Sequence, residues 1–174
     1  MSVESAGPGF VPNFSCTHSV TLDHAIDKVF TMIGTSSGHE RVCRLSSMCS
    51  AFELLAKDTV SLQPGASLNE SHARLLPASD SGLPRQHFTM SETVPILFGI
   101  IKTVVKLVGT LTWDEENKLA LYETAASGSG ILVWKIREFK KVGEDKTLVT
   151  ETIQGQCPAL LKSIVQSQAS KAHA

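Results

Sequence analysis

The chain has 174 residues, of which 42% are hydrophobic and 19% are charged, and this composition suits one domain with a buried core. A formal net charge of −1 excludes the basic surplus that proteins use to bind a nucleic-acid polyanion, so we expect no nucleic-acid partner. The first fifteen residues have neither the cationic region nor the apolar core of a secretory signal, so we expect a cytoplasmic protein.

The spacing of the cysteines bears on disulfides and on metal binding. The four cysteines stand at positions 16, 43, 49 and 157, none forms a C-x-x-C pair, and no histidine cluster lies near them at zinc-ligand spacing. We therefore predict reduced thiols, no metal site and no cofactor.

The most apolar stretch covers residues 94–108 and contains two lysines. It is too short to span a bilayer, which takes about 20 apolar residues, so we expect no transmembrane segment. Its first part, Pro95–Ile101, is either the buried start of a strand or an exposed lid or dimer face. We favour a lid or an entrance that bends at Gly99, because Pro95 interrupts the strand before it, and the same surface could support a homodimer.

Two short helices follow the first predicted strand, Cys16–Asp23. Asp23 is the predicted N-cap of a helix at His24–Ile33, in which apolar residues recur at helical spacing and which Gly34 ends. A second helix is predicted at Gly38–Leu45. Its inward side chains are Val42 and Leu45.

The next part of the chain contains β-rich runs separated by Gly, Pro, Asn and Ser, which predicts strands joined by turns. Polar turns near residues 114–117 and 142–145 each join two such runs into a hairpin. The predicted elements are a strand at Ser50–Leu62, a loop at Gln63–Gly82 with a short strand near Ala73–Leu76, a strand at Arg85–Val94 that Pro95 stops, and hairpins at Lys102–Ala125 and Gly130–Gly155.

A final helix is predicted at Pro158–His173, because proline suits a first helical turn and apolar residues recur on one stripe. Hairpins make the sheet antiparallel, and one long helix can cover seven strands only if the sheet curves around it. The predicted fold class is therefore α+β. It is a helix-grip fold in which a seven-stranded curved antiparallel sheet wraps the C-terminal helix and leaves an apolar cavity.

This order of elements, with the segments GTLTWDEENKLALYE, VWKIREFKKVGEDKTLVTETIQG and PALLKSIVQSQASKAH, resembles the START-like (SRPBCC) superfamily of polyketide cyclases, pollen-allergen proteins and lipid-transfer domains. The resemblance implies a START-like domain over residues 15–174, after a flexible segment at residues 1–14. It also implies a hydrophobic small-molecule ligand, but the superfamily has no universal catalytic motif. The Gly-rich loop of the pollen-allergen branch is not recognisable in Gln63–Asn69.

Strand register decides which side chains face the cavity, since a slip of one residue exchanges the two faces of a strand. A first turn centred on residues 115–116 gives these cross-strand pairs: Leu111 with Ala120, Gly109 with Tyr122 and Leu107 with Thr124. Gly109 then leaves room beside Tyr122 for a ring or a ligand. The predicted inward residues are Val105, Leu107, Leu111, Trp113, Tyr122 and Thr124, and Glu123 points outward.

The same alternation assigns faces to the other strands. The inward residues before Pro95 are Phe88, Met90 and Glu92. In the second hairpin Trp134 and Ile136 are predicted inward, and Lys135 and Arg137 outward. The facing strand has two solutions: a two-residue turn places Val149, Glu151 and Ile153 inward, whereas a three-residue turn places Thr150, Thr152 and Gln154 inward and pairs Arg137 with Glu151 outside.

The polar candidates for catalysis are Glu92, Tyr122 and Glu151. A carboxylate that is desolvated has a raised pKa and can act as a general acid or base near neutral pH. A tyrosine hydroxyl can donate a hydrogen bond to a carbonyl or to a developing enolate. The predicted ligand-binding residues are Phe88, Met90, Leu107, Leu111, Trp113, Thr124, Trp134, Ile136, Leu161 and Val165.

Each catalytic candidate also has a purely structural interpretation. Glu92 can be a solvated residue at a strand end, and Glu151 can be a cross-strand partner of Arg137 or Lys135. Tyr122 can pack in the core with its hydroxyl on a backbone carbonyl.

Three functions fit this pattern. The first is a cofactor-independent enzyme of secondary metabolism that binds a polyketide- or terpenoid-like molecule and catalyses its cyclisation, dehydration or isomerisation. The second is a non-catalytic carrier or receptor for a lipid or hormone-like ligand. The third is an interaction module with a filled interior.

Overall fold

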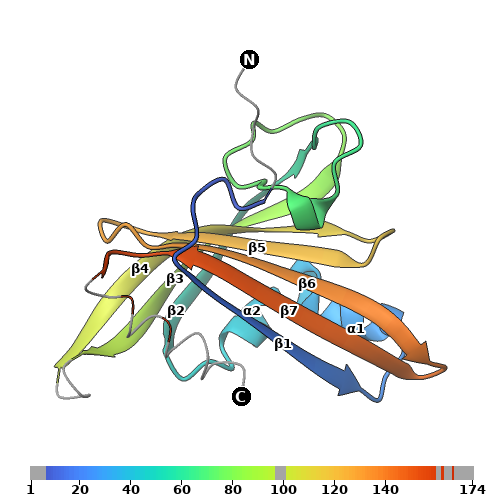
Figure 1. Ribbon diagram of the computed structural model, residues 1–174, viewed down its shortest axis with the longest axis horizontal. Coiled ribbons are helices and arrows are strands. Elements are labelled where there is room, and N and C mark those ends of the chain that lie inside the picture. Colours follow the sequence, from blue (N-terminus) through green and yellow to red (C-terminus); the bar gives the residue numbers. More distant parts are fainter. Residues whose placement is uncertain (1–6, 97–100, 160–161, 163–165, 167–174) are drawn as a thin grey trace.

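The structure is a computed structural model that describes residues 7–96 and 101–159 together with Lys162 and Gln166. Within these residues the chain forms one sheet of seven strands and two α-helices (Figure 1). The elements are β1 (Phe14–Leu22), α1 (Ile26–Ile33), α2 (Ser36–Cys43), β2 (Cys49–Val60), a 3-10 helix (Leu68–Glu70), β3 (Leu83–Ile96), β4 (Ile101–Asp114), β5 (Leu119–Ala126), β6 (Leu132–Gly143) and β7 (Lys146–Gln156).

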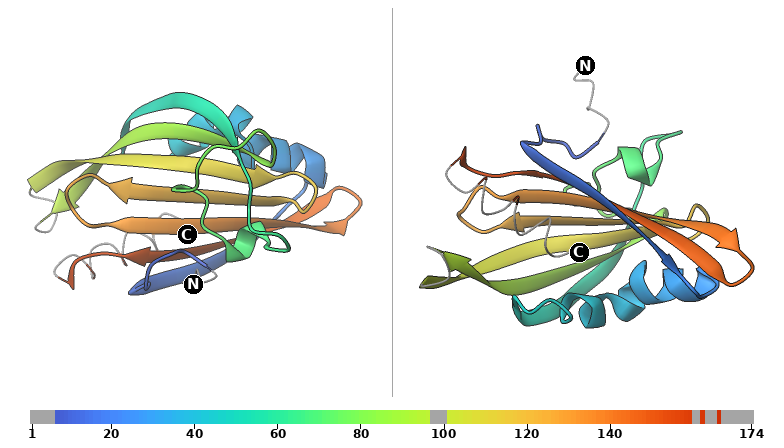
Figure 2. Two further views of the ribbon diagram at one scale, coloured as in Figure 1. Left: turned by 90° about the horizontal axis from the view of Figure 1, so that it is seen from above. Right: turned by 60° about the horizontal axis from the view of Figure 1, so that its bottom comes forward.

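All neighbouring strands are antiparallel, and their order is β1-β7-β6-β5-β4-β3-β2. From β2 to β7 each strand pairs with the next one along the chain. β1 pairs with β7 instead, so α1 and α2 carry the chain from one edge of the sheet to the other across one face (Figure 2). The predicted antiparallel sheet and the predicted order of elements as far as β7 are confirmed.

We call the face that α1 and α2 cover the helix face. There Val29 and Phe30 of α1 pack against a buried cluster that includes Leu111, Phe139 and Val149. The rings of Phe30 and Phe139 meet edge to face with their centroids 5.1 Å apart. Burial of such a side chain contributes roughly 1.5–3 kcal/mol, so this cluster anchors α1 on the sheet.

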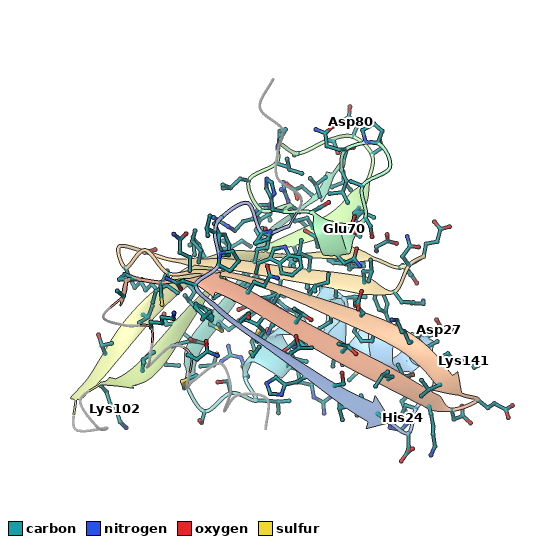
Figure 3. The ribbon with its side chains drawn as sticks, viewed as in Figure 1. His24, Asp27, Glu70, Asp80, Lys102 and Lys141 are labelled. Atoms are coloured by element: carbon teal, nitrogen blue, oxygen red, sulfur yellow. The ribbon has the colours of Figure 1, made fainter. Side chains whose placement is uncertain are left out.

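The two helices cover only part of the length of the sheet. Asp27 on α1 and Lys141 near the β6–β7 turn lie at the same end of the molecule (Figure 3). Lys102, near the tip of the β3–β4 hairpin, lies at the opposite end (Figure 3). The β3–β4 hairpin therefore extends beyond the region that α1 covers.

We call the opposite face the loop face, because residues 61–82, between β2 and β3, fold over it (Figure 1). The indole Nε1 of Trp134 donates a hydrogen bond of 2.8 Å to the carbonyl of Ser71 in this segment. The middle of the sheet is therefore buried on both faces. The apolar cluster under the segment comprises Val60, Leu68, Ala73, Leu119, Leu121, Trp134 and Ile136.

Two buried charged residues hold residues 61–82 on the loop face, and with Asp58 we call them the polar clamp. The guanidinium of Arg85 donates to both carboxylate oxygens of Asp58, at 2.8 and 2.7 Å. It also donates to the carbonyls of Ala73 and Leu76, at 2.6 and 2.9 Å. The carboxylate of Glu123 accepts the backbone N–H groups of residues 73 and 74, at 2.9 and 2.8 Å.

The first helix ends where the sequence predicts, but it begins later than predicted. Gly34 is the C-cap of α1, as predicted. Asp23 is not the N-cap: the helix begins later, its N-cap is Ala25, and no side chain hydrogen-bonds to that end. Asp23 lies instead beside Lys146, with Oδ1 3.5 Å from Nζ.

The second helix is shifted toward the N-terminus from its predicted position. Thr35 is its N-cap and accepts the backbone N–H of Ser37 through its hydroxyl. The sequence predicts that Leu45 faces the core. In the structure α2 ends at Cys43, so Leu45 lies beyond the helix and is 80% exposed. The buried residues of α2 are Gly38 and His39.

Two predictions for the neighbourhood of β3 are wrong. Residues 73–76 form a turn, closed by a hydrogen bond between the N–H of Leu76 and the carbonyl of Ala73, and not a strand. β3 does not stop at Pro95 but continues to Ile96. The N–H of Thr93 points to the β2 side, where it reaches Met48, and position 95 is two residues further on, past the end of the β2 pairing. A proline there removes no hydrogen bond from the sheet.

The β4–β5 register differs by two residues from the predicted one. Leu111 pairs with Tyr122, and Gly109 pairs with Thr124. The loop contains four residues, 115–118, because Asp114 Oδ1 accepts the N–H of Asn117 at 3.0 Å and residue 118 has a φ of 53°. A shift of two residues leaves each side chain on its predicted face.

Gly109 does not leave a space in the sheet. A Cβ at this position would lie 2.6 Å from Cζ of Phe88 and 2.7 Å from Cγ2 of Thr124. The space left by the missing side chain is therefore filled by Phe88 and Thr124, and the prediction of room for a ligand beside Gly109 is wrong.

The β6–β7 hairpin turns at Glu144 and Asp145. Val149, Glu151 and Ile153 lie on the helix face, as the two-residue turn predicts. Arg137 pairs with Glu151, but on the helix face and not outside.

The predicted C-terminal helix, Pro158–His173, falls mostly on residues outside the described part of the chain, as does Gly99 of the predicted lid. That helix and the apolar cavity beside it therefore stay predictions. In the part of the chain that the structure describes, no helix has the length and apolar character needed to cross a membrane.

Candidate functional site

A cluster of rings lies on the helix face where α2 packs on the sheet. His39 of α2 is 5% exposed, and its ring centroid lies 5.3 Å from that of Phe52, 4.6 Å from Phe88 and 5.6 Å from Tyr122. Phe88 also stacks on Phe52 and on Tyr122, with centroids 5.5 and 5.2 Å apart. One helix and three strands thus build an apolar wall around a single histidine.

Two side chains of α2, His39 and Cys43, are held neutral in this wall. Cys43, one helical turn after His39, has its Sγ 3.9 Å from both ring nitrogens. Burial, followed by the charges of Lys135 and Arg137, lowers the pKa of His39 to about 3. Burial raises the pKa of Cys43 to about 11. The thiol is therefore protonated at neutral pH and is a poor nucleophile.

Charged side chains from β6 and β7 lie beside the ring cluster. The Nζ of Lys135 lies 4.5 Å from the centroid of the Tyr122 ring and 3.7 Å from Oε2 of Glu151. Nε of Arg137 donates to the same Oε2, and its Nη1 donates to the carbonyl of Ile33 at 2.9 Å. Two cations therefore share one carboxylate. With Glu92, we call Tyr122, Lys135, Arg137 and Glu151 the ionisable patch.

Burial shifts the pKa of several groups in the ionisable patch. It lowers the pKa of Lys135, against the effect of the Glu151 charge and together with that of Arg137. It raises the pKa of Glu92, against the effect of Lys135, and it raises the pKa of Tyr122 well above its usual value. For Lys135 and Glu92 both shifts favour the uncharged form, so the pKa values of this amine and this carboxyl lie closer together than those of a lysine and a glutamate in water.

The structure brings most of the predicted site residues together on the helix face. The three catalytic candidates lie within the ionisable patch, and Phe88 belongs to the ring cluster. The carboxylate of Glu151 is used by Arg137 and Lys135, which matches the structural interpretation of this residue. The predicted binding residues on this face are Phe88, Met90, Leu107, Leu111, Trp113 and Thr124.

Two predicted ligand-binding residues are on the wrong face. Trp134 and Ile136 pack under residues 61–82 on the loop face, so they do not contact the helix face. Lys135 and Arg137, which were expected outside, occupy the helix face instead. The two remaining predicted binding residues, Leu161 and Val165, lie outside the described residues.

Sequence reasoning missed the contribution of α2 to the site. His39 and Cys43 are separated by four residues, which is the spacing that places two side chains on one face of a helix. That spacing could have paired them. The contact of His39 with three rings from distant strands has no local signal in the sequence.

A groove of about 480 Å³ also opens on the sheet, but not at the ionisable patch. Strand pairing places most of its lining on the loop face of β2, β3 and β4, including Glu53, Thr89 and Lys106. The predicted cavity lies on the other face, so this groove is not that cavity.

Among the residues that the structure describes, no group of three or more His, Cys, Asp or Glu side chains is arranged to hold a metal ion. The cysteines at 16, 43, 49 and 157 are free thiols.

Comparison with known proteins gives a fold. No family model and no curated protein sequence matches the chain. Among solved structures, a START superfamily protein from Mycobacterium smegmatis has a TM-score of 0.53 at 7% identity, over 91% of this chain and 92% of that one. The Zhui aromatase/cyclase from Streptomyces sp. R1128 has a TM-score of 0.53 at 12% identity, over 83% and 68%.

A third similar structure is norcoclaurine synthase from Thalictrum flavum in complex with dopamine and hydroxybenzaldehyde. Its TM-score is 0.53 at 12% identity, over 91% of this chain and 80% of that one. At such identities the likeness concerns the backbone and not the side chains of the site. Together with the strand order and the two helices on one face, these structures identify the fold of this chain as START-like.

Proposed function

We propose that this protein binds a hydrophobic, polyketide- or terpenoid-like small molecule against the helix face and catalyses its cyclisation, dehydration or isomerisation by general acid–base chemistry. The observation that supports this is the position of the ionisable patch directly beside the apolar ring cluster. An apolar surface with a few convergent polar groups is typical of small-molecule sites. Two solved structures with this backbone, the aromatase/cyclase and norcoclaurine synthase, are enzymes.

In this proposal Glu92 and Tyr122 perform the proton chemistry. Because burial raises the pKa of Glu92, its carboxyl keeps a proton to higher pH than an exposed glutamate does, which suits a general acid or base. Because burial also raises the pKa of Tyr122, its hydroxyl keeps its proton and can donate a hydrogen bond to a carbonyl or to an enolate. Glu151 balances the two cations of the patch and acts as a positioning residue.

The alternative proposal is a non-catalytic carrier of a lipid or hormone-like molecule. It is favoured by the neutral state of His39 and Cys43, which makes the wall beside the patch apolar at pH 7. Such a wall retains an uncharged ligand without any chemical step.

Native mass spectrometry of the protein purified from its own cells tests the proposal. The expected result is one retained apolar compound for each chain, which denaturation then releases for identification. A bare mass, together with no fluorescence gain from 8-anilinonaphthalene-1-sulfonate, would contradict ligand binding. Conversion of the released compound by fresh protein supports the enzyme, and its recovery unchanged supports the carrier.

Variants then assign the roles. Glu92→Gln and Tyr122→Phe should each lower turnover about 100-fold, the smaller end of the usual contribution of a general acid or base. Glu53→Gln is the matched control, because Glu53 is an exposed carboxylate on the loop face of β2. Unchanged rates in the first two variants would remove these residues from the mechanism.

A further inference from the structure

Lys135 is a primary amine placed in the middle of the sheet. It lies on β6, between Tyr122 of β5 and Ile153 of β7. Its side chain is only 16% exposed, and its Nζ lies over the Tyr122 ring. A lysine normally extends its charged head into water, so this position needs an explanation beyond packing.

Lys135 shares the carboxylate of Glu151 with a second cation. Glu151 is shared with Arg137, which is bonded to it directly, whereas the Nζ of Lys135 is 3.7 Å away. The other titratable groups that act on the amine are Glu92 on β3, Cys43 on α2 and Arg137 on its own strand. Cys43 and Glu92 also favour the charged amine, but less than Glu151 does.

The consequence is an amine whose uncharged form is more accessible than that of a lysine in water. Burial lowers the pKa of Lys135, Arg137 lowers it further, and the charge of Glu151 opposes both. A neutral amine in an apolar setting is a nucleophile for carbonyl compounds.

We propose that Lys135 forms a Schiff base with an apolar aldehyde or ketone held on the helix face, which deepens the proposed function by naming the substrate class and rests on it. The Nζ lone pair attacks the carbonyl carbon and gives a carbinolamine. The carbonyl oxygen takes up protons and leaves as water, and a carbon–nitrogen double bond forms in its place. Amine and carbonyl compound thus give imine and water, with no oxidant or reductant.

Neighbouring residues suit this reaction. Glu92 lies on the same face of β3 as Phe88 and Met90, and burial raises its pKa, so its carboxyl suits the role of proton donor to the departing oxygen. The ring of Tyr122, already under the Nζ, stabilises the positive charge of the protonated imine by a cation–π interaction. The protonated imine withdraws electrons from the adjacent carbon, which makes cyclisation or isomerisation of the bound molecule easier.

Reductive trapping tests this inference on the full chain. The protein is incubated with 2-naphthaldehyde and sodium cyanoborohydride, and the site of labelling is mapped by peptide mass spectrometry. The expected result is a single naphthylmethyl group on Lys135, formed faster than at any other lysine or at the amino terminus. Lys135→Met should lose this label completely, and Lys106→Met, which changes an exposed lysine on the loop face, should keep it.

Two further measurements separate the possible failures. Lys135→Arg keeps the positive charge and should also lose the label, so a folding defect in Lys135→Met does not decide the test. 2-Naphthylmethanol has the same rings but no carbonyl, and its binding reports the apolar site alone. Labelling spread evenly over the lysines, with naphthylmethanol still bound, overturns the Schiff base and leaves the proposed function standing. Loss of both signals overturns the two together.

Discussion

Replacement of His39 by phenylalanine should remove a proton-linked instability of the folded chain. In the folded state the imidazole lies among the rings of Phe52, Phe88 and Tyr122, and its pKa is about 3. In the unfolded chain the same group titrates near 6.5. Between these two pH values the unfolded chain binds one proton more than the folded chain does. The titration of His39 therefore leaves the free energy of unfolding unchanged above pH 6.5 and lowers it progressively as the pH falls toward 3.

The size of this effect follows from the two pKa values. One extra bound proton changes the free energy of unfolding by about 1.4 kcal/mol per pH unit. Because the histidine of the unfolded chain is only partly protonated near pH 6.5, the loss between pH 7 and pH 5 is about 2 kcal/mol. Phenylalanine keeps the ring contacts and cannot take up a proton, so His39→Phe should not show this loss.

Urea unfolding of the wild type and of His39→Phe at pH 7, 6 and 5 measures the difference. Comparison of the two proteins cancels the other groups that titrate in this range. His24→Phe is the control, because it makes the same substitution at an exposed position before α1, and it should retain the wild-type pH dependence. Parallel pH profiles for the wild type and His39→Phe would mean that the folded chain protonates His39, and the argument from burial would be refuted.

Two other substitutions test the packing of the sheet. Asp58→Asn should lower the free energy of unfolding at pH 7 by about 3 kcal/mol in urea titration, because it leaves the buried Arg85 without its anion. Hydrogen bonds from Arg85 and then from His87 hold the pKa of Asp58 at about 2, so the wild type should lose this contribution between pH 4 and pH 2. Equal free energies of unfolding for Asp58→Asn and the wild type at pH 7 would contradict the polar clamp. Gly155→Ala should destabilise by about 2 kcal/mol, because its Cβ would overlap the Phe14 ring. The double variant Gly155→Ala/Phe14→Leu should regain part of the loss in thermal unfolding, and equal stability of single variant and wild type would disprove the overlap.

The faces of β3 and β4 could be predicted because one side of each strand is more apolar than the other, and the faces of β5 followed from its pairing with β4. Met90, Leu107 and Leu111 all lie where alternation places them. The β4–β5 register was wrong by two residues, and it did not matter for the faces, since the side-chain period of a strand is two.

The faces of β6 could not be predicted in the same way. Alternation assumes that one side of a strand meets water, but residues 61–82 bury the loop face of β6 as fully as α1 buries its other face. Trp134 and Ile136 are therefore in a core, as expected, but in the core of the opposite face. No local pattern indicates that a loop of mostly polar residues will cover a sheet.

The ionisable patch illustrates a second limit of sequence reasoning. Charged residues such as Lys135 and Arg137 are expected in water because burial of a charge is costly. Their position on the helix face depends on Glu151 from the next strand and on the carbonyl of Ile33 from α1, which are tertiary contacts. The departure from the simple rule marks the candidate site.

The pairing of β1 with β7 sets the order in which this chain can be completed during synthesis. β1 ends at Leu22, and its partner begins at Lys146, so the first strand leaves the ribosome long before the strand that it needs. At about 5–20 residues per second this interval is on the order of ten seconds. Until then the growing chain can assemble the meander from β2 to β6, while β1 exposes an unpaired edge that other chains can join. A nascent chain that stops before β7 therefore lacks the closing step of its sheet, and it is the species from which aggregation should begin.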